Sequence, residues 1–144
     1  MTNEEYRSLA DSRQPRSRTG RNMLRAFWVG GAICCIGQAI TDALTGLGLS
    51  RADAGSWCCV ALIFLGAVLT GLGLYDEIAK YAGGGTLVPI TGFANSVVAP
   101  ALEFKTEGLI TGTAAKLFII SGPVIVYGVG ASVVYGLVLA AFGR

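Results

Sequence analysis

Long apolar stretches separated by short polar segments dominate the chain. Four such stretches lie at about 23–49, 56–75, 86–102 and 117–142. A helix needs about 20 apolar residues, at a rise of ~1.5 Å each, to cross a bilayer. The pattern predicts an all-α integral membrane protein with about four membrane segments. We expect a polar N-terminal tail, residues 1–22, followed by a single transmembrane helical domain, residues 23–144.

The third stretch differs from the others, because it combines an uncharged sequence with helix breakers and a polar centre, Asn95-Ser96. Irregular backbone is tolerated in lipid only where it is buried in protein or lines a watery cavity. Discontinuous helices of this kind form many transport sites. We predict that 86–102 is a broken or re-entrant segment that lines a polar path. Its predicted hinge residues are Gly83, Gly84, Gly85, Pro89 and Pro100.

Two alternatives stay open for this segment. It is an interfacial hairpin if Asn95 and Ser96 merely cap a helix. If it re-enters, the chain crosses the membrane three times and Arg144 lies on the side opposite to the N-terminus. If it crosses, both termini lie on the same side.

The first stretch carries a row of small and polar residues at intervals of four, which places them on one face of a helix. We expect Gly30 and Cys34 to let another helix approach closely, and Gln38 and Asp42 to add hydrogen-bonding groups. A charge at the bilayer centre costs at least ~2.5 kcal/mol on insertion scales. Asp42 is therefore predicted to lie near the far interface or to line a cavity.

The last stretch contains a second ridge of small residues, Gly128, Ser132 and Gly136. This spacing favours close packing of helices. The partner is another helix of the same chain or a helix of another subunit.

Polar segments separate the apolar stretches. Residues 50–55, SRADAG, predict a tight turn, and Glu103–Gly108 predicts a solvated loop or a docking surface for a soluble partner. Tyr75, Asp76 and Lys80 mark the return of the second stretch to the side of the N-terminus.

Composition agrees with a membrane location. The 144 residues are 53% hydrophobic and 14% charged, whereas soluble domains carry roughly 25% charged residues. Basic residues concentrate ahead of the first stretch, which predicts a cytoplasmic N-terminus that contacts anionic lipid headgroups rather than nucleic acid. They are Arg7, Arg13, Arg16, Arg18, Arg21 and Arg25.

Little in the sequence suggests catalysis or a cofactor. The chain has no histidine, and its four cysteines form two adjacent pairs, Cys34-Cys35 and Cys58-Cys59, without the spacing of a zinc or redox site. The sequence contains no recognisable combination of a nucleophile with a neighbouring base. We therefore expect no catalytic residues, no metal, no cofactor and no enzymatic activity.

Three motifs resemble a known family. GGGTLVPITGFANSVVAPALEFKTEGLITG, from Gly83, is followed by AAKLFIISGPVIVYG and preceded by AFWVGGAICCIGQ. Together they resemble the SpoVAC/SpoVAEb family of sporulation membrane proteins of endospore-forming bacteria. The resemblance extends over most of the chain from about Arg25. The EFKTEG motif and the arginine-rich tail favour the AC-type branch.

The resemblance implies a place in the SpoVA complex of the forespore and spore inner membrane. It implies a channel or permease subunit that moves dipicolinic acid with calcium into the forespore and releases it at germination, and that responds to membrane tension. Implied partners are AE-type membrane subunits and a soluble AD-type subunit. Because four segments can hardly enclose such a path, we expect a homo- or hetero-oligomer.

The residues suit that cargo in chemical terms. Dipicolinate is an aromatic dianion that calcium neutralises, so its path should be polar without a ring of fixed charge. Phe93 offers a ring for stacking, although a core- or lipid-facing Phe is more common. The hypothetical path residues are Gln38, Asp42, Thr91, Phe93, Asn95 and Ser96. The alternative function is an accessory scaffold that anchors a soluble partner while another subunit forms the pore.

Overall fold

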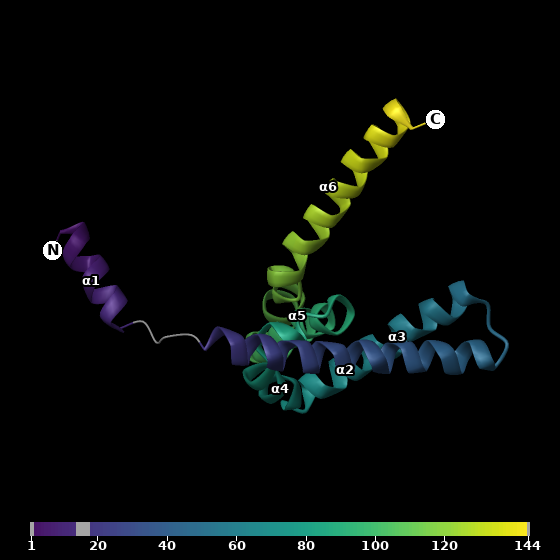
Figure 1. The fold of residues 1–144 in the computed structure, drawn as a ribbon, viewed down its shortest axis with the longest axis horizontal. Helices are drawn as coiled ribbons and strands as arrows, with labels where there is room; N and C mark the ends of the chain where they lie inside the picture. Colours follow the sequence, from purple (N-terminus) through teal and green to yellow (C-terminus); the bar gives the residue numbers. More distant parts are fainter. Residues whose placement is uncertain (1, 14–17, 144) are drawn as a thin grey trace.

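The computed structural model describes residues 2–13 and 18–143, and every regular element among them is helical, which confirms the all-α prediction (Figure 1). Arg16 and Arg144, both used in the topology predictions, lie outside the described residues. The α-helices are α1 (Asn3–Arg13), α2 (Thr19–Gly46), α3 (Arg51–Gly71), α4 (Leu74–Ala82), α5 (Pro89–Glu103) and α6 (Phe118–Phe142). Shorter elements are the 3-10 turns η1 (Gly83–Thr86) and η2 (Lys105–Glu107) and the π-helical η3 (Leu109–Ala114).

Three helical segments of the described chain are long and apolar enough to cross a membrane. They are Thr19–Gly46, Arg51–Gly71 and Leu109–Phe142. The 15 residues of α5 extend only ~22 Å at ~1.5 Å per residue, less than the ~30 Å hydrocarbon core. The third predicted segment is therefore too short to cross as one straight helix.

Helices α2 and α3 form an antiparallel hairpin, which lies horizontally in Figure 1. Gly48, with φ +94°, turns the chain after α2. Ser50 caps α3: its Oγ accepts from the Asp53 N–H at 3.2 Å and donates to the Asp53 carboxylate at 2.7 Å. The prediction of a turn through residues 50–55 is wrong, because this cap starts the helix at Arg51.

Helix α3 ends at Gly71, and Gly73 turns the chain with φ +72° into the separate helix α4. Tyr75 is therefore the second residue of α4 rather than the end of the preceding helix. Its buried hydroxyl donates a 2.7 Å hydrogen bond to the Thr86 carbonyl, which fixes α4 against η1.

The glycine run forms η1, which lies directly against α2. A Cβ built on Gly85 would lie 2.5 Å from the Ala26 carbonyl oxygen and 2.7 Å from the Ala26 Cα. A Cβ on Gly30, one turn further along α2, would lie 3.2 Å from the Gly85 oxygen. Only glycine at position 85 permits this backbone-to-backbone contact.

The prolines of the third segment act differently from one another. Pro89 occupies the first turn of α5, where its missing N–H needs no partner. Pro100 lies inside α5 and is buried, and the helix continues past it to Glu103. The prediction that Pro100 interrupts the helix is therefore wrong. The discontinuity lies at residues 83–88 instead.

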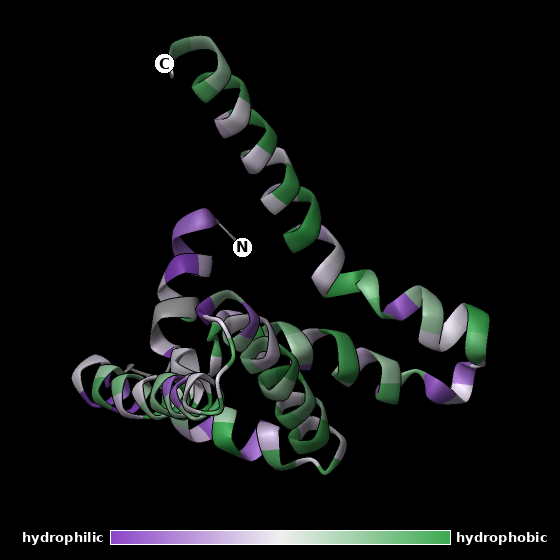
Figure 2. Cartoon of the chain, turned by 90° about the vertical axis from the view of Figure 1, so that its right-hand side faces the viewer, coloured by the Kyte–Doolittle hydropathy of each residue, from purple (hydrophilic) through white to green (hydrophobic). Residues whose placement is uncertain are grey.

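Part of the basic tail forms helix α1. The irregular spacing of its arginines does not predict this helix. At the other end, α6 projects away from the hairpin (Figure 1) and is apolar along its length (Figure 2). None of its most apolar window is buried inside the described chain. In a bilayer, such a helix requires lipid or another subunit as its neighbour.

We expect Gly85→Ala to destabilise the fold, because the added methyl group would clash with the α2 backbone. Overpacking of this kind costs about 1–3 kcal/mol. Gly84→Ala is the matched control, since a Cβ at Gly84 meets nothing within 4 Å. Thermal unfolding in detergent, followed by size-exclusion chromatography, should show a lower midpoint for the first variant only. Equal midpoints would contradict the close contact.

Candidate functional site

The side chains predicted to line a path come from α2 and α5. The surroundings of the α5 residues are set mainly by the crossing of α5 over the second half of α3. At this crossing a Cβ on Gly66 would lie 3.3 Å from both the Thr91 carbonyl oxygen and the Ala94 Cβ. The absence of a side chain at position 66 therefore lets the two helices approach closely.

Asn95 is half-buried and takes part in this crossing. The Thr70 hydroxyl of α3 lies 2.9 Å from the Asn95 Oδ1 and 2.7 Å from the Gly66 carbonyl oxygen. The two residues line a pocket of about 260 Å³ between α3, α4 and α5, which also includes Asp76. The pocket brings a carboxylate at the surface together with an amide at the crossing.

Thr91 lies one turn before Asn95 but faces a different space. It is 6% exposed, and its buried Oγ1 has no hydrogen-bond partner in the described part of the chain. An unsatisfied buried hydroxyl costs about 1–3 kcal/mol. The nearby Thr86 hydroxyl, in contrast, donates to the Gly83 carbonyl at 3.1 Å.

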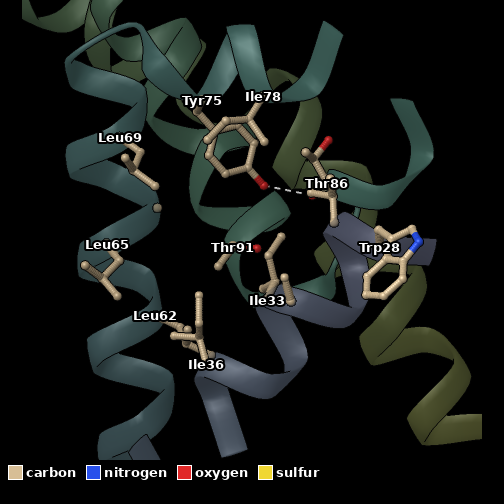
Figure 3. Close-up of a pocket in the computed structure, with 13 residues that line it drawn as sticks. Trp28, Ile33, Ile36, Leu62, Leu65, Leu69, Tyr75, Ile78, Thr86 and Thr91 are labelled. Carbon is tan, nitrogen blue, oxygen red and sulfur yellow. Dashed lines mark hydrogen bonds between the residues drawn. The ribbon is translucent and has the colours of Figure 1, made fainter. Parts of the chain in front are cut away.

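Thr91 and Thr86 both line a groove of about 330 Å³ (Figure 3). The wall of this groove comes from α2, α3, α4 and α5 and is almost wholly apolar. Such a lining does not suit an anion or a metal complex. The remaining lining residues are Trp28, Val29, Ala32, Ile33, Ile36, Leu62, Leu65, Gly66, Leu69, Tyr75 and Ile78.

Gln38 and Asp42 form a second polar site in the other half of the hairpin. The Gln38 Nε2 donates to the Asp42 Oδ1 at 2.8 Å, and both side chains are exposed. They line a wide pocket of about 580 Å³ with Thr41, Thr45 and Arg51. Arg51 provides a cation in the same pocket as the Asp42 carboxylate, which neither the spacing nor the composition predicts.

The predicted path residues therefore divide among separate places instead of forming one lining. Asn95 lines the pocket beside Asp76, Thr91 the apolar groove, and Gln38 and Asp42 the pocket beside Arg51. The Ser96 hydroxyl donates to the Phe93 carbonyl at 2.8 Å, within its own helix, and the Phe93 ring is partly exposed.

The predicted helix-packing residues also differ in their surroundings. Gly30 lies against η1, whereas Cys34 is exposed. The close contact between α2 and α3 occurs instead at Gly37, whose carbonyl accepts from the buried Cys58 thiol at 3.2 Å. A Cβ on Gly128 or Gly136 would meet nothing within 4 Å, and the Ser132 hydroxyl donates to its own helix.

Three residues that the sequence did not assign to the path contribute to the site. Thr70 is the hydrogen-bond donor at the crossing, and Tyr75 fixes η1. Asp76 lies in the Asn95 pocket and pairs with Lys80 at 2.9 Å. Thr70 could have been identified from the sequence, because it is the only Thr in the apolar run from Trp57 to Leu74.

Electrostatics at α4 are set by one compact cluster. The Lys80 ammonium lies 2.7 Å from the Glu77 carboxylate and 2.9 Å from that of Asp76. The hydrogen bonds to Glu77 and then to Asp76 raise the pKa of Lys80 above its ordinary value. Lys80 therefore remains charged, with its charge balanced inside the cluster.

Comparison with known proteins identifies two similarities. The family model described as SpoVAC/SpoVAEB sporulation membrane protein matches residues 22–138. The chain is also 43% identical over 147 residues to "Stage V sporulation protein AC" of Bacillus subtilis (strain 168), an alignment that covers 100% of this chain and 98% of that protein. No solved structure matches the chain.

We expect Thr70→Val and Thr91→Val to have opposite consequences. The first change removes the donor to Asn95, and hydrogen bonds between membrane helices contribute on average ~0.6 kcal/mol. The second replaces an unpartnered hydroxyl by a methyl group of similar size, which is neutral or stabilising. Thermal unfolding in detergent should show a lower midpoint for Thr70→Val only. A drop for Thr91→Val as large as that for Thr70→Val would show that the Thr91 hydroxyl has a partner.

Proposed function

The chain belongs to the SpoVAC/SpoVAEB family of sporulation membrane proteins, and from this premise we propose that it is a channel or permease subunit of the SpoVA complex. Its cargo is dipicolinic acid with calcium, carried into the forespore during sporulation and released at germination. It acts in the forespore and spore inner membrane, with its N-terminus in the cytoplasm and with opening favoured by membrane tension.

The observation that supports this proposal best is the pocket between α3, α4 and α5. It contains a half-buried amide, Asn95, held by the Thr70 hydroxyl, and it includes the Asp76 carboxylate. Polar side chains placed between membrane helices commonly mark substrate pathways. Asn95 belongs to the short helix that follows the discontinuity, the arrangement in which many transporters place their binding sites.

The charge of this pocket fits the calcium complex better than the free dipicolinate dianion. The cluster of Asp76, Glu77 and Lys80 has two carboxylates and one ammonium, so it carries a net negative charge. This charge repels a dianion but not the neutral one-to-one complex of calcium and dipicolinate. Carboxylate and amide oxygens are also ligands that calcium accepts. The pocket therefore favours entry of the paired cargo.

A single chain supplies only part of the proposed path. The pocket at Asn95 measures about 260 Å³, and the second polar site at Gln38 and Asp42 lies in the other half of the α2–α3 hairpin. We propose that neighbouring subunits, either copies of this chain or AE-type proteins, complete the wall between them. The exposed helix α6 provides apolar surface for that assembly.

A second candidate function is an accessory scaffold. It is favoured by the apolar lining of the groove that contains Thr91, and by the division of the predicted path residues among separate pockets. In this case another subunit forms the pore. The exposed turn η2, Lys105–Glu107, would provide a docking surface for the soluble AD-type subunit.

We expect spores whose only copy of this protein carries Asn95→Leu to contain severalfold less dipicolinic acid, because the change removes the amide from the pocket. Asn95→Ser is the matched variant, because serine keeps a small polar group in the pocket. Spores with this change should retain most of their dipicolinic acid. Membrane abundance, checked by immunoblot, must equal that of the wild type. Normal dipicolinic acid content in Asn95→Leu spores would remove Asn95 from the path.

Accessibility to thiol reagents separates the two functions. In a chain whose four native cysteines are replaced, we expect Asn95→Cys to react with small hydrophilic thiol reagents, because its pocket reaches the surface at Asp76. Thr91→Cys should remain shielded, because its site is buried. Protection of position 95 in the assembled complex would favour the scaffold.

A further inference from the structure

The apolar groove beside Thr91 opens to the outside of the helical hairpin and continues toward the N-terminal tail. Trp28 and Ile33 of α2 and Leu65 of α3 line it (Figure 3). Trp28 is 69% exposed, so the groove is open at this residue. Tryptophan is enriched at the depth of the lipid headgroups, and this preference favours a position at the membrane interface for this end of the groove.

A basic pocket of about 240 Å³ lies immediately beyond Trp28. Asn22, Arg25, Lys80 and Tyr81 line it, together with the backbone of the glycine run. Arg25 lies three residues before Trp28 on α2, and Tyr81 lies three residues after Ile78 on α4. Residues at this spacing share one face of a helix. The basic pocket and the apolar groove therefore follow one another along the same faces of α2 and α4.

Arg25 is the cation of this pocket that remains available to a ligand. Its Cζ lies 4.5 Å from the centre of the Tyr81 ring, and it forms no ion pair with any described residue. Stacking on an aromatic ring leaves the N–H groups at the edge of the guanidinium plane available to an anion. Lys80, in contrast, is balanced by Asp76 and Glu77.

The dimensions and chemistry of the groove favour one kind of occupant. Its volume of about 330 Å³ suits a slender molecule, whereas a helix with its side chains is about 10–12 Å wide. Its apolar wall excludes a charged solute. An acyl chain meets these requirements, and the adjacent guanidinium complements a phosphate.

We propose that the groove and the basic pocket together bind one anionic phospholipid, drawn from the leaflet on the side of the N-terminal tail. The phosphate binds Arg25, and one acyl chain lies along Trp28 and Ile33 toward Leu65. Among the lining residues, this site shares only Tyr75 with the Asn95 pocket, and it does not depend on the identity of the transported cargo.

Trp28 is the natural probe of this site, because Trp57→Phe leaves it as the only tryptophan of the chain. The protein is reconstituted in phosphatidylcholine bilayers in which part of the lipid is replaced by phosphatidylglycerol with brominated acyl chains. Brominated phosphatidylcholine at the same fraction is the neutral reference. We expect the anionic lipid to quench Trp28 fluorescence more strongly than the neutral lipid.

Two pairs of variants locate the two ends of the lipid. Arg25→Gln should lower the preference for the anionic lipid about fivefold, the usual effect of one basic residue near an anionic surface. Arg51→Gln, at the opposite end of the hairpin, should retain it. Ala32→Phe should weaken quenching by filling the groove, whereas Cys35→Phe, also exposed on α2, should not.

Three results would overturn the proposal. Equal quenching by the two lipids would show that no anionic lipid is selected. Loss of the preference on addition of inorganic phosphate would assign the basic pocket to a free anion. Protection of Trp28 from both lipids would indicate that a second protein chain fills the groove.

Discussion

The contact between the backbone of Gly85 and that of α2 at Ala26 is the constraint on which the rest of the helical bundle depends. Apolar side chains gain little by exchanging lipid for protein, so membrane helices associate through close packing and hydrogen bonds. Gly85 holds η1 on α2, and Gly66 admits α5 to α3. The hydrogen bond from the Tyr75 hydroxyl to the Thr86 carbonyl then fixes α4 against η1. The groove and the Asn95 pocket are the spaces left by these contacts.

The hydrophobic pattern predicted the helices well, because each spanning segment must satisfy its own backbone hydrogen bonds and is therefore recognisable locally. The glycine run also predicted the discontinuity. Pro100 misled the prediction, because a proline removes one hydrogen bond of a helix without necessarily ending it. Helix α4 was missed because its charged residues indicated only an exit from the membrane, and charge alone does not show that the segment is a separate helix that packs through Tyr75.

The candidate site was harder to predict than the fold. Thr91, Asn95 and Gln38 were grouped by residue type, but type does not specify which neighbouring helix a side chain faces. Thr91 and Asn95 are one turn apart on α5 and nevertheless line different spaces. Arg25 is similar: the sequence identifies it as part of a basic flank, and only the fold places it beside Tyr81 and at the end of an apolar groove.

The short connection between α2 and α3 has a consequence for how the chain enters the membrane. It occupies only residues 47–50, so the two helices enter the bilayer as one unit while the rest of the chain is still being synthesised. Helix α5 then meets a finished surface that already presents Gly66. Helix α6 follows α5 in the chain and meets almost no surface of the described residues that it could cover. In a bilayer its neighbours are therefore lipid or helices of another subunit.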